Sequence, residues 1–136
     1  MPPPSTGSTQ LYAVDALTPS NVWVAGQTYT SGSGYQPYVA QFDGASWRRV
    51  ATPTINDGRL TDIVALSPSN IVAVGAIGNG YASIVLHWDG SSWAREAAPY
   101  GKLTGAAAVG PSTFWAVGTR FGPDAYEERT FTMVRT

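Results

Sequence analysis

The side chains suited to acid–base or metal chemistry are few in this chain. His87 is the only histidine, and no cysteine is present, which excludes disulfides, thiolate zinc sites and cysteine nucleophiles. A metal site or an acid–base pair needs partners in matching geometry, and the sequence places none beside His87. We interpret His87 as a structural or exposed strand residue, and we predict neither a metal nor a cofactor.

Two carboxylates recur, in the pattern Asp-Gly-x-Ser-Trp that begins at Asp43 and Asp89. A carboxylate that accepts local N–H bonds has a lowered pKa, which is the opposite of what a general acid needs. We therefore interpret Asp43-Gly44 and Asp89-Gly90 as structural turns. Glycoside hydrolysis needs two carboxylates about 5–10 Å apart across a cleft. The remaining acids show no such pairing, so we predict no catalytic residue among Asp57, Asp62, Asp124, Glu127 and Glu128.

Tryptophan rings could stack on sugars, but burial is the commoner role of so large a side chain. Trp47 and Trp93 follow the two Asp-Gly pairs, whereas Trp23 and Trp115 share a position that holds Val72 in the middle of the chain. Because this position accepts valine, we interpret Trp23 and Trp115 as packing between repeat units.

These residues recur because the chain repeats itself. Residues 11–26 (LYAVDALTPSNVWVAG), 60–75 (LTDIVALSPSNIVAVG) and 103–118 (LTGAAAVGPSTFWAVG) align. The first two copies also share a tail, FDGASWRRVATP at 42–53 and WDGSSWAREAAP at 88–99. A unit of roughly 40–50 residues that cannot bury its own face is typical of a propeller or solenoid.

Each copy divides into short strands separated by turn residues. A first strand (12–17 in the first copy) precedes a Pro-containing turn at 18–21, 67–70 and 110–113. Second strands are expected at 22–26, 71–75 and 114–118, and third strands at 38–42, 83–88 and about 129–134. Two-residue Asp-Gly hairpins lead to fourth strands that begin at Trp47 and Trp93. The prediction is an all-β chain of three antiparallel units, the third without its outer strand.

Composition narrows the function classes. The chain has 136 residues, 43% hydrophobic and only 12% charged, with a formal net charge of −1. The absence of a basic patch argues against a nucleic-acid partner, and no apolar run approaches the roughly 18 residues of a membrane span. Residues 1–10 (MPPPSTGSTQ) lack the basic and apolar regions of a signal peptide. We interpret them as a linker, so secretion would depend on a segment of a longer parent protein.

The strings at 88–93 (WDGSSW) and 114–118 (FWAVG) resemble the Trp-Asp-Gly-type β-propeller repeats of long secreted or surface bacterial proteins, within the kelch and Asp-box-like propeller superfamily. The resemblance covers residues 11–134. It implies three four-stranded blades, at about 11–53, 60–99 and 103–136, and an extracellular location. The Asp-box proper has an extra residue between Asp and Gly, so a sialidase is not implied.

Segments that vary between copies predict where binding occurs. The connections after the second strands (27–37, 76–82 and 119–128) and the crossings between units (51–59 and 97–102) differ in length, and both emerge on one face of an up-and-down blade. This loop face would gather aromatic, amide and charged groups suited to a glycan or an extended polypeptide. Its predicted residues are Tyr29, Tyr35, Asn56, Asp57, Arg59, Tyr81, Tyr100, Phe121, Asp124 and Tyr126.

Propellers usually close with about 4–8 blades, and this chain supplies just under three. We therefore expect a homodimer that completes six blades, with residues 2–10 of the partner a candidate for the missing outer strand. The favoured function is a non-enzymatic, lectin-like binding module. Two alternatives remain open: the C-terminal piece of a secreted carbohydrate-active enzyme, and a purely structural propeller scaffold.

Overall fold

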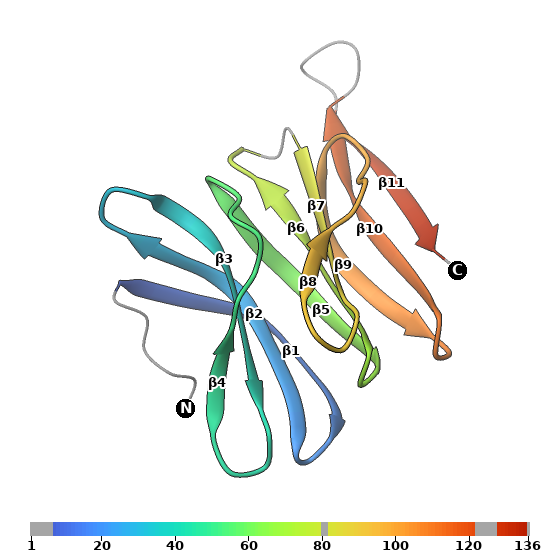
Figure 1. Ribbon diagram of the computed structural model, residues 1–136. Helices are drawn as coiled ribbons and strands as arrows, with labels where there is room; N and C mark the ends of the chain where they lie inside the picture. Colours follow the sequence, from blue (N-terminus) through green and yellow to red (C-terminus); the bar gives the residue numbers. More distant parts are fainter. Residues whose placement is uncertain (1–6, 80–81, 122–127, 136) are drawn as a thin grey trace.

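The computed structural model describes residues 7–79, 82–121 and 128–135, and within them the chain is all-β without a helix (Figure 1). Three antiparallel sheets follow one another along the chain, with strand orders β1-β2-β3-β4, β5-β6-β7-β8 and β11-β10-β9. We call them sheets 1, 2 and 3. This confirms the all-β prediction, and among the described residues the third sheet has three strands. The strands are β1 (Ser8–Thr18), β2 (Asn21–Thr30), β3 (Gly34–Phe42), β4 (Trp47–Val50), β5 (Gly58–Ser67), β6 (Asn70–Ile77), β7 (Ala82–Trp88), β8 (Trp93–Arg95), β9 (Lys102–Val109), β10 (Thr113–Phe121) and β11 (Glu128–Arg135).

The hairpin β2–β3 is longer than expected. β2 continues to Thr30 and β3 starts at Gly34, so the connection predicted at 27–37 shrinks to residues 31–33. Thr and Tyr favour extended backbone, and Tyr29 pairs directly with Tyr35. β1 likewise begins at Ser8, paired with Tyr29, inside the segment predicted as a linker. These stretches are rich in glycine and serine, so the sequence did not predict strands there.

The Asp-Gly connections also differ from the expected two-residue turns. Phe42 pairs with Trp47 and Trp88 with Trp93, so each loop holds four residues. Only the glycines take positive φ, 98° at Gly44 and 103° at Gly90. The aspartate instead caps the loop: Asp89 Oδ1 accepts hydrogen bonds from the N–H groups of Ser91 and Ser92 at 2.8 and 2.9 Å.

A β-bulge explains the glycine that ends every copy of the repeat. In each sheet the first strand carries an extra residue directly after the repeated leucine, which faces Gly26, Gly75 or Gly118. A Cβ atom at Gly75 would lie 1.9 Å from the carbonyl oxygen of Arg59, and the other two glycines face the same clash. The bulged strand therefore approaches its neighbour so closely that only glycine fits.

The sheets pack face to face in chain order (Figure 1). We call the face that carries Trp23, Val72 and Trp115 the front of its sheet, and the opposite face the back. The front of sheet 1 and the back of sheet 2 form the largest apolar cluster, which includes Trp23, Val39, Ile71, Leu86, Trp88 and Trp93. The front of sheet 2 and the back of sheet 3 form a second, with Val72, Val74, Val85, Phe114 and Ala116.

Carboxylates tie the sheets together. Asp15 Oδ2 accepts a hydrogen bond from Ala65 N in the next sheet at 2.8 Å, and Asp62 Oδ2 accepts one from Ala106 N at the same distance. In both cases Oδ1 accepts the N–H of the following residue. Each bond joins a carboxylate of one sheet to a strand N–H of the next and so helps to fix one sheet on the other.

The two repeated tryptophans have different environments. Trp23 is 1% exposed, and its ring centroid lies 5.3 Å from Trp88 and 5.8 Å from Trp93, so it packs between units as predicted. Trp115 was expected to do the same, and this is wrong: its side chain is 47% exposed. The reason is that no described sheet lies against the front of sheet 3.

Candidate functional site

The crossing from sheet 1 to sheet 2, residues 51–57, is held in a defined shape. Its buried anchor, Ile55, joins the first core, and Ile55 N donates to Gln36 Oε1 at 2.9 Å. Gly58 N closes the turn by donating to Ile55 O at 3.0 Å. A surface loop anchored in this way presents its polar residues at fixed positions.

Asp57 lies at the end of this crossing, in the left-handed backbone region with φ 58°. Its N–H donates to Tyr35 O, and its carbonyl accepts from Gly78 N, both at 2.9 Å. Arg59 Nη1 then donates to Gly78 O at 2.7 Å. The backbone of Asp57 thus joins the β2–β3 hairpin to the β6–β7 hairpin, and a cleft forms between them.

This Asp57 cleft has a volume of about 470 Å³ and is lined by Tyr12, Gln27, Tyr35, Asp57, Arg59, Gly78 and Asn79. One wall is preorganised: Gln27 Nε2 donates to Gln10 Oε1 at 2.6 Å and to the Tyr12 hydroxyl at 3.0 Å. On the other side, Tyr35 is held edge-on by Tyr29, with ring centroids 5.2 Å apart.

The lining combines aromatic rings with a carboxylate, a guanidinium and amides. Such groups offer a face for apolar C–H surfaces together with donors and acceptors for hydroxyl groups. The cleft can therefore bind a neutral, hydroxyl-rich ligand without desolvating a net charge.

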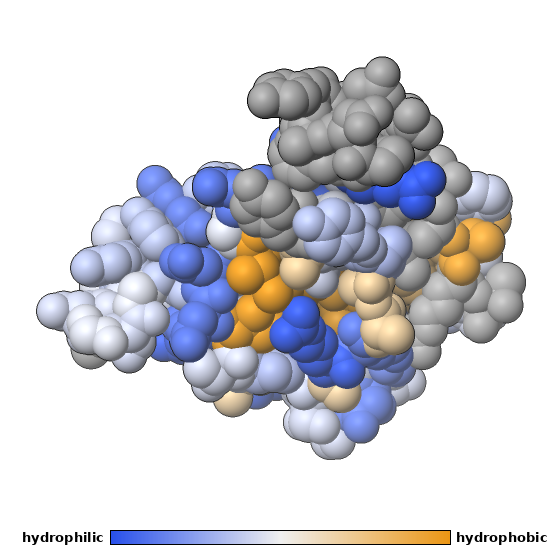
Figure 2. All heavy atoms as spheres, turned by 90° about the horizontal axis from the view of Figure 1, so that it is seen from above, coloured by the Kyte–Doolittle hydropathy of each residue, from blue (hydrophilic) through white to orange (hydrophobic). Residues whose placement is uncertain are grey.

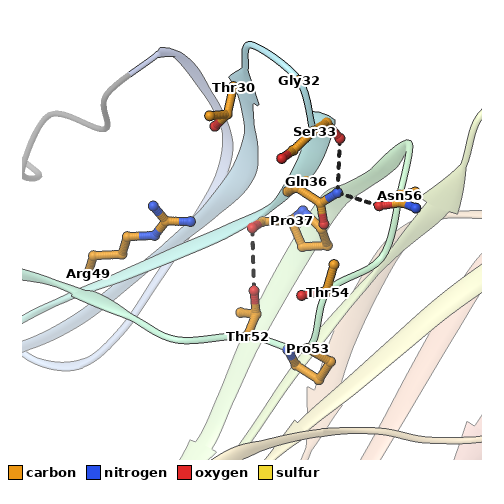
Figure 3. Close-up of a pocket in the computed structure, with 10 residues that line it drawn as sticks. All are labelled: Thr30, Gly32, Ser33, Gln36, Pro37, Arg49, Thr52, Pro53, Thr54 and Asn56. Atoms are coloured by element: carbon orange, nitrogen blue, oxygen red, sulfur yellow. Dashed lines mark hydrogen bonds between the residues drawn. The ribbon is translucent and has the colours of Figure 1, made fainter.

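A second cleft, with a volume of about 400 Å³, is lined by residues of the β2–β3 hairpin, of β4 and of the crossing (Figure 3). Gln36 spans it: its Nε2 donates to Ser33 O and to Asn56 Oδ1, at 3.3 and 2.8 Å. Its lining is mainly polar, with hydroxyl groups from Thr30, Ser33, Thr52 and Thr54 and the guanidinium of Arg49, and it also includes Pro37 and Pro53. Asn56 therefore belongs to this Gln36 cleft and not to the Asp57 cleft.

The structure brings together part of the predicted loop face. Tyr35, Asp57 and Arg59 share one cleft, Tyr29 supports it, and Asn56 lies in the Gln36 cleft. Tyr100 is separate, in a third cleft beside Arg95 and Glu96. Phe121 ends β10. The predictions for Tyr81, Asp124 and Tyr126 lie outside the described residues.

Sequence reasoning missed Tyr12, which lies within β1, and it did not select Gln27, although residue 27 begins the variable connection predicted at 27–37; the structure places Gln27 within β2. The signal that could have found Tyr12 is its place directly after the repeated leucine. The bulge there turns this residue out of the ladder, between Leu11 and Ala13.

Figure 2 views the end of the molecule where these hairpins meet. Hydrophilic side chains cover the part over sheet 1, and an apolar area lies at the centre of the view. This end of the molecule is therefore of mixed polar and apolar character.

His87 and the turn aspartates have structural surroundings. His87 Nε2 lies 2.8 Å from Asn70 Oδ1, and its Nδ1 is 3.7 Å from Glu96 Oε1. In sheet 1 the matching Gln41 Nε2 donates to Asn21 Oδ1 at 2.9 Å, so the same contact recurs with different side chains. Bonds from the N–H groups of Ser92 and Ser91 lower the pKa of Asp89 to about 2, and that of Asp43 is lowered by its Ser46 and Ala45 bonds.

No protein-family model matches the chain, and no curated protein does. The described residues contain no group of three or more side chains that could hold a metal ion. Nor do they contain a helix of the length and apolar character that crossing a membrane requires. The three repeats within the chain can, however, be compared with one another.

Proposed function

We propose that this protein is a non-enzymatic, lectin-like β-propeller repeat module, extracellular within a secreted parent protein, that binds a glycan in the Asp57 cleft. The observation that carries the proposal is the composition of that cleft: two tyrosine rings, a carboxylate, a guanidinium and amides on a hydrogen-bonded strand scaffold. Sugar rings need exactly this pairing of an apolar stacking surface with fixed hydrogen-bonding groups.

Binding is favoured over catalysis because Asp57 is the single carboxylate in the described lining of the cleft. Hydrolysis of a glycosidic bond uses two. The Asp57 backbone conformation is also determined by two hydrogen bonds that serve the scaffold. Binding therefore explains the site without a second carboxylate, which hydrolysis would require.

The proposal includes self-association into a closed propeller of two chains. Sheet 3 exposes Val109, Trp115, Val117 and Val134 on its front, and sheet 1 exposes Leu11 and Val14 on its back. A soluble protein rarely leaves two apolar faces open to water. A second copy would cover both and make six blades.

The test is a glycan array followed by calorimetric titration of the strongest binder. We expect Asp57→Asn and Tyr35→Ala each to weaken binding at least tenfold. Asn tolerates positive φ, so Asp57→Asn changes the carboxylate without straining the crossing.

The matched control is Tyr100→Ala, which changes another exposed tyrosine, outside the Asp57 cleft, and this variant should bind as the parent does. Absence of binding by a folded protein across the array would contradict the proposal and favour a purely structural scaffold. Turnover of aryl glycosides that is lost in Asp57→Asn would favour an enzyme instead.

A further inference from the structure

The packing of sheet 1 on sheet 2 shows what a front-face tryptophan requires. Trp23 inserts against the pair formed by Trp88, the last residue of β7, and Trp93, the first residue of β8. These two rings lie 5.8 Å apart at an interplanar angle of 47°. We call such a cross-strand aromatic pair on a back face an aromatic seat.

Sheet 1 carries the same seat on its own back. Phe42 ends β3, Trp47 begins β4, and their rings lie 5.4 Å apart at 40°. No described residue outside sheet 1 belongs to the apolar cluster beneath Trp47. Both rings remain half-buried, whereas Trp88 and Trp93 are buried under Trp23.

Sheet 3 has no fourth strand among the described residues and therefore no such seat on its back. The residue that faces sheet 3 from sheet 2 is Val72, and not tryptophan. A front-face tryptophan thus occurs in sheet 1, which faces a seat, and valine occurs in sheet 2, which faces none. Trp115 occupies the same repeat position and is exposed, so within the described chain no aromatic seat lies against it.

From this correspondence we infer that Trp115 of one chain inserts into the Phe42–Trp47 seat of a second copy, joining the front of sheet 3 to the back of the partner's sheet 1. The inference rests on the proposed self-association and specifies its interface. The contact is head-to-tail, and in a two-chain ring it is formed twice, once in each direction. Every tryptophan at this repeat position then packs on an aromatic pair.

Neighbouring residues on both faces fit the same contact. Val117 and Val134 flank Trp115 on the front of sheet 3, where Trp115 pairs with Val134. Val14, which pairs with Val24, stands 65% exposed on the back of sheet 1. The two surfaces are apolar, and both continue the stacking that already joins sheets 1, 2 and 3.

The experiment is light scattering on a sizing column, with the unmodified chain and three variants. We expect twice the 14.3 kDa chain mass for the parent and for the control Tyr100→Ser, and a single chain mass for Trp115→Ser and for Val14→Arg. Both altered side chains are largely exposed, so the variants should fold, which circular dichroism will verify.

Mixing distinguishes a head-to-tail contact from a symmetric one. The Trp115→Ser variant keeps an unaltered back of sheet 1, and the Val14→Arg variant keeps an unaltered front of sheet 3. These two faces can pair, so the mixture should form a mixed dimer through one unaltered interface. Association of the mixture confirms the inference; failure to associate overturns it.

The two proposals fail differently. A parent chain that stays monomeric at all concentrations overturns self-association and the seat together. A dimer that persists unchanged in Trp115→Ser overturns the seat alone. Neither outcome touches glycan binding, which the array measures separately.

Discussion

Gly75 shows how one missing Cβ supports the repeat. The carbonyl oxygen of Arg59 occupies the space that a side chain would need, because Thr61 is bulged out of the ladder. We predict that Gly75→Ala destabilises the fold by about 1–3 kcal/mol or more, the usual cost of forcing atoms into filled space. Urea denaturation at fixed protein concentration measures it.

The matched control is Gly105→Ala, another strand glycine. There the nearest atom to a new Cβ is Val117 Cγ2 at 3.5 Å, an ordinary contact. Alanine should be neutral or slightly stabilising, since it lowers the entropy of the unfolded chain. Equal denaturation midpoints for the two variants would show that the bulge does not require glycine.

Asp89 makes a prediction about acid stability. Its pKa of about 2 in the folded protein lies below the unfolded value of about 3.9. The stabilisation is therefore complete above about pH 4 and is lost as the pH falls toward 2. Asp89→Asn keeps an oxygen that can accept the Ser91 and Ser92 N–H bonds but has no charge to titrate. Its unfolding free energy should vary less between pH 4 and 2, as measured by urea titration, and parallel curves would contradict this.

At the scale of elements, the sequence was sufficient for the strands and insufficient for their ends. Alternating and β-branched residues located all the described strands, and the Pro-Ser turns between the first two strands of sheets 1 and 2 hold two residues as expected. The four-residue Asp-Gly loops were missed because Asp89 stabilises them through its side chain, an interaction that the Asp-Gly pair does not reveal.

Only part of the candidate site was predictable, because some of its residues are brought there by pairing between strands. Asp57 and Arg59 were selected because both fall in the predicted crossing 51–59, whose length differs from that of 97–102; the structure places Arg59 in β5. Tyr12 and Gln27 join them because of a bulge and a strand extension, which depend on pairing between separate strands, such as Gln10 with Gln27, and not on local composition. Trp115 was predicted to pack between units because Trp23 shares its repeat position, but within the described chain its side chain is exposed.

The inter-sheet carboxylates carry a prediction at this scale. Asp62→Ala removes the acceptor for Ala106 N and for Ile63 N. A fully buried N–H left unpaired costs about 1–3 kcal/mol; the Ala106 bond is only half-buried, so we expect a loss at the low end of that range, on the contact between sheets 2 and 3. Hydrogen exchange by NMR should accelerate at Ala106 while Ala65, held by Asp15, exchanges as before. Faster exchange at both amides would mean that the sheets open as one unit.

For the whole molecule, the proposed self-association would link assembly to folding. Within the described residues the chain has two inter-sheet cores, and the outer faces of sheets 1 and 3 carry exposed apolar side chains. Anything that binds the folded state and not the unfolded one raises apparent stability by mass action. If two chains cover each other's outer faces, stability must depend on protein concentration.

We therefore predict that the urea midpoint rises with concentration, because a hundredfold increase adds about 2.7 kcal/mol per dimer at equilibrium. Trp115→Ser should unfold at one midpoint at every concentration, close to that of the most dilute parent sample, since its folded chain has no partner to gain. Tyr100→Ser should follow the parent. A parent midpoint that does not move with concentration, in a sample that light scattering shows to be dimeric, would mean that the dimer contributes nothing to folding, and the two outer faces would then need another explanation than mutual burial.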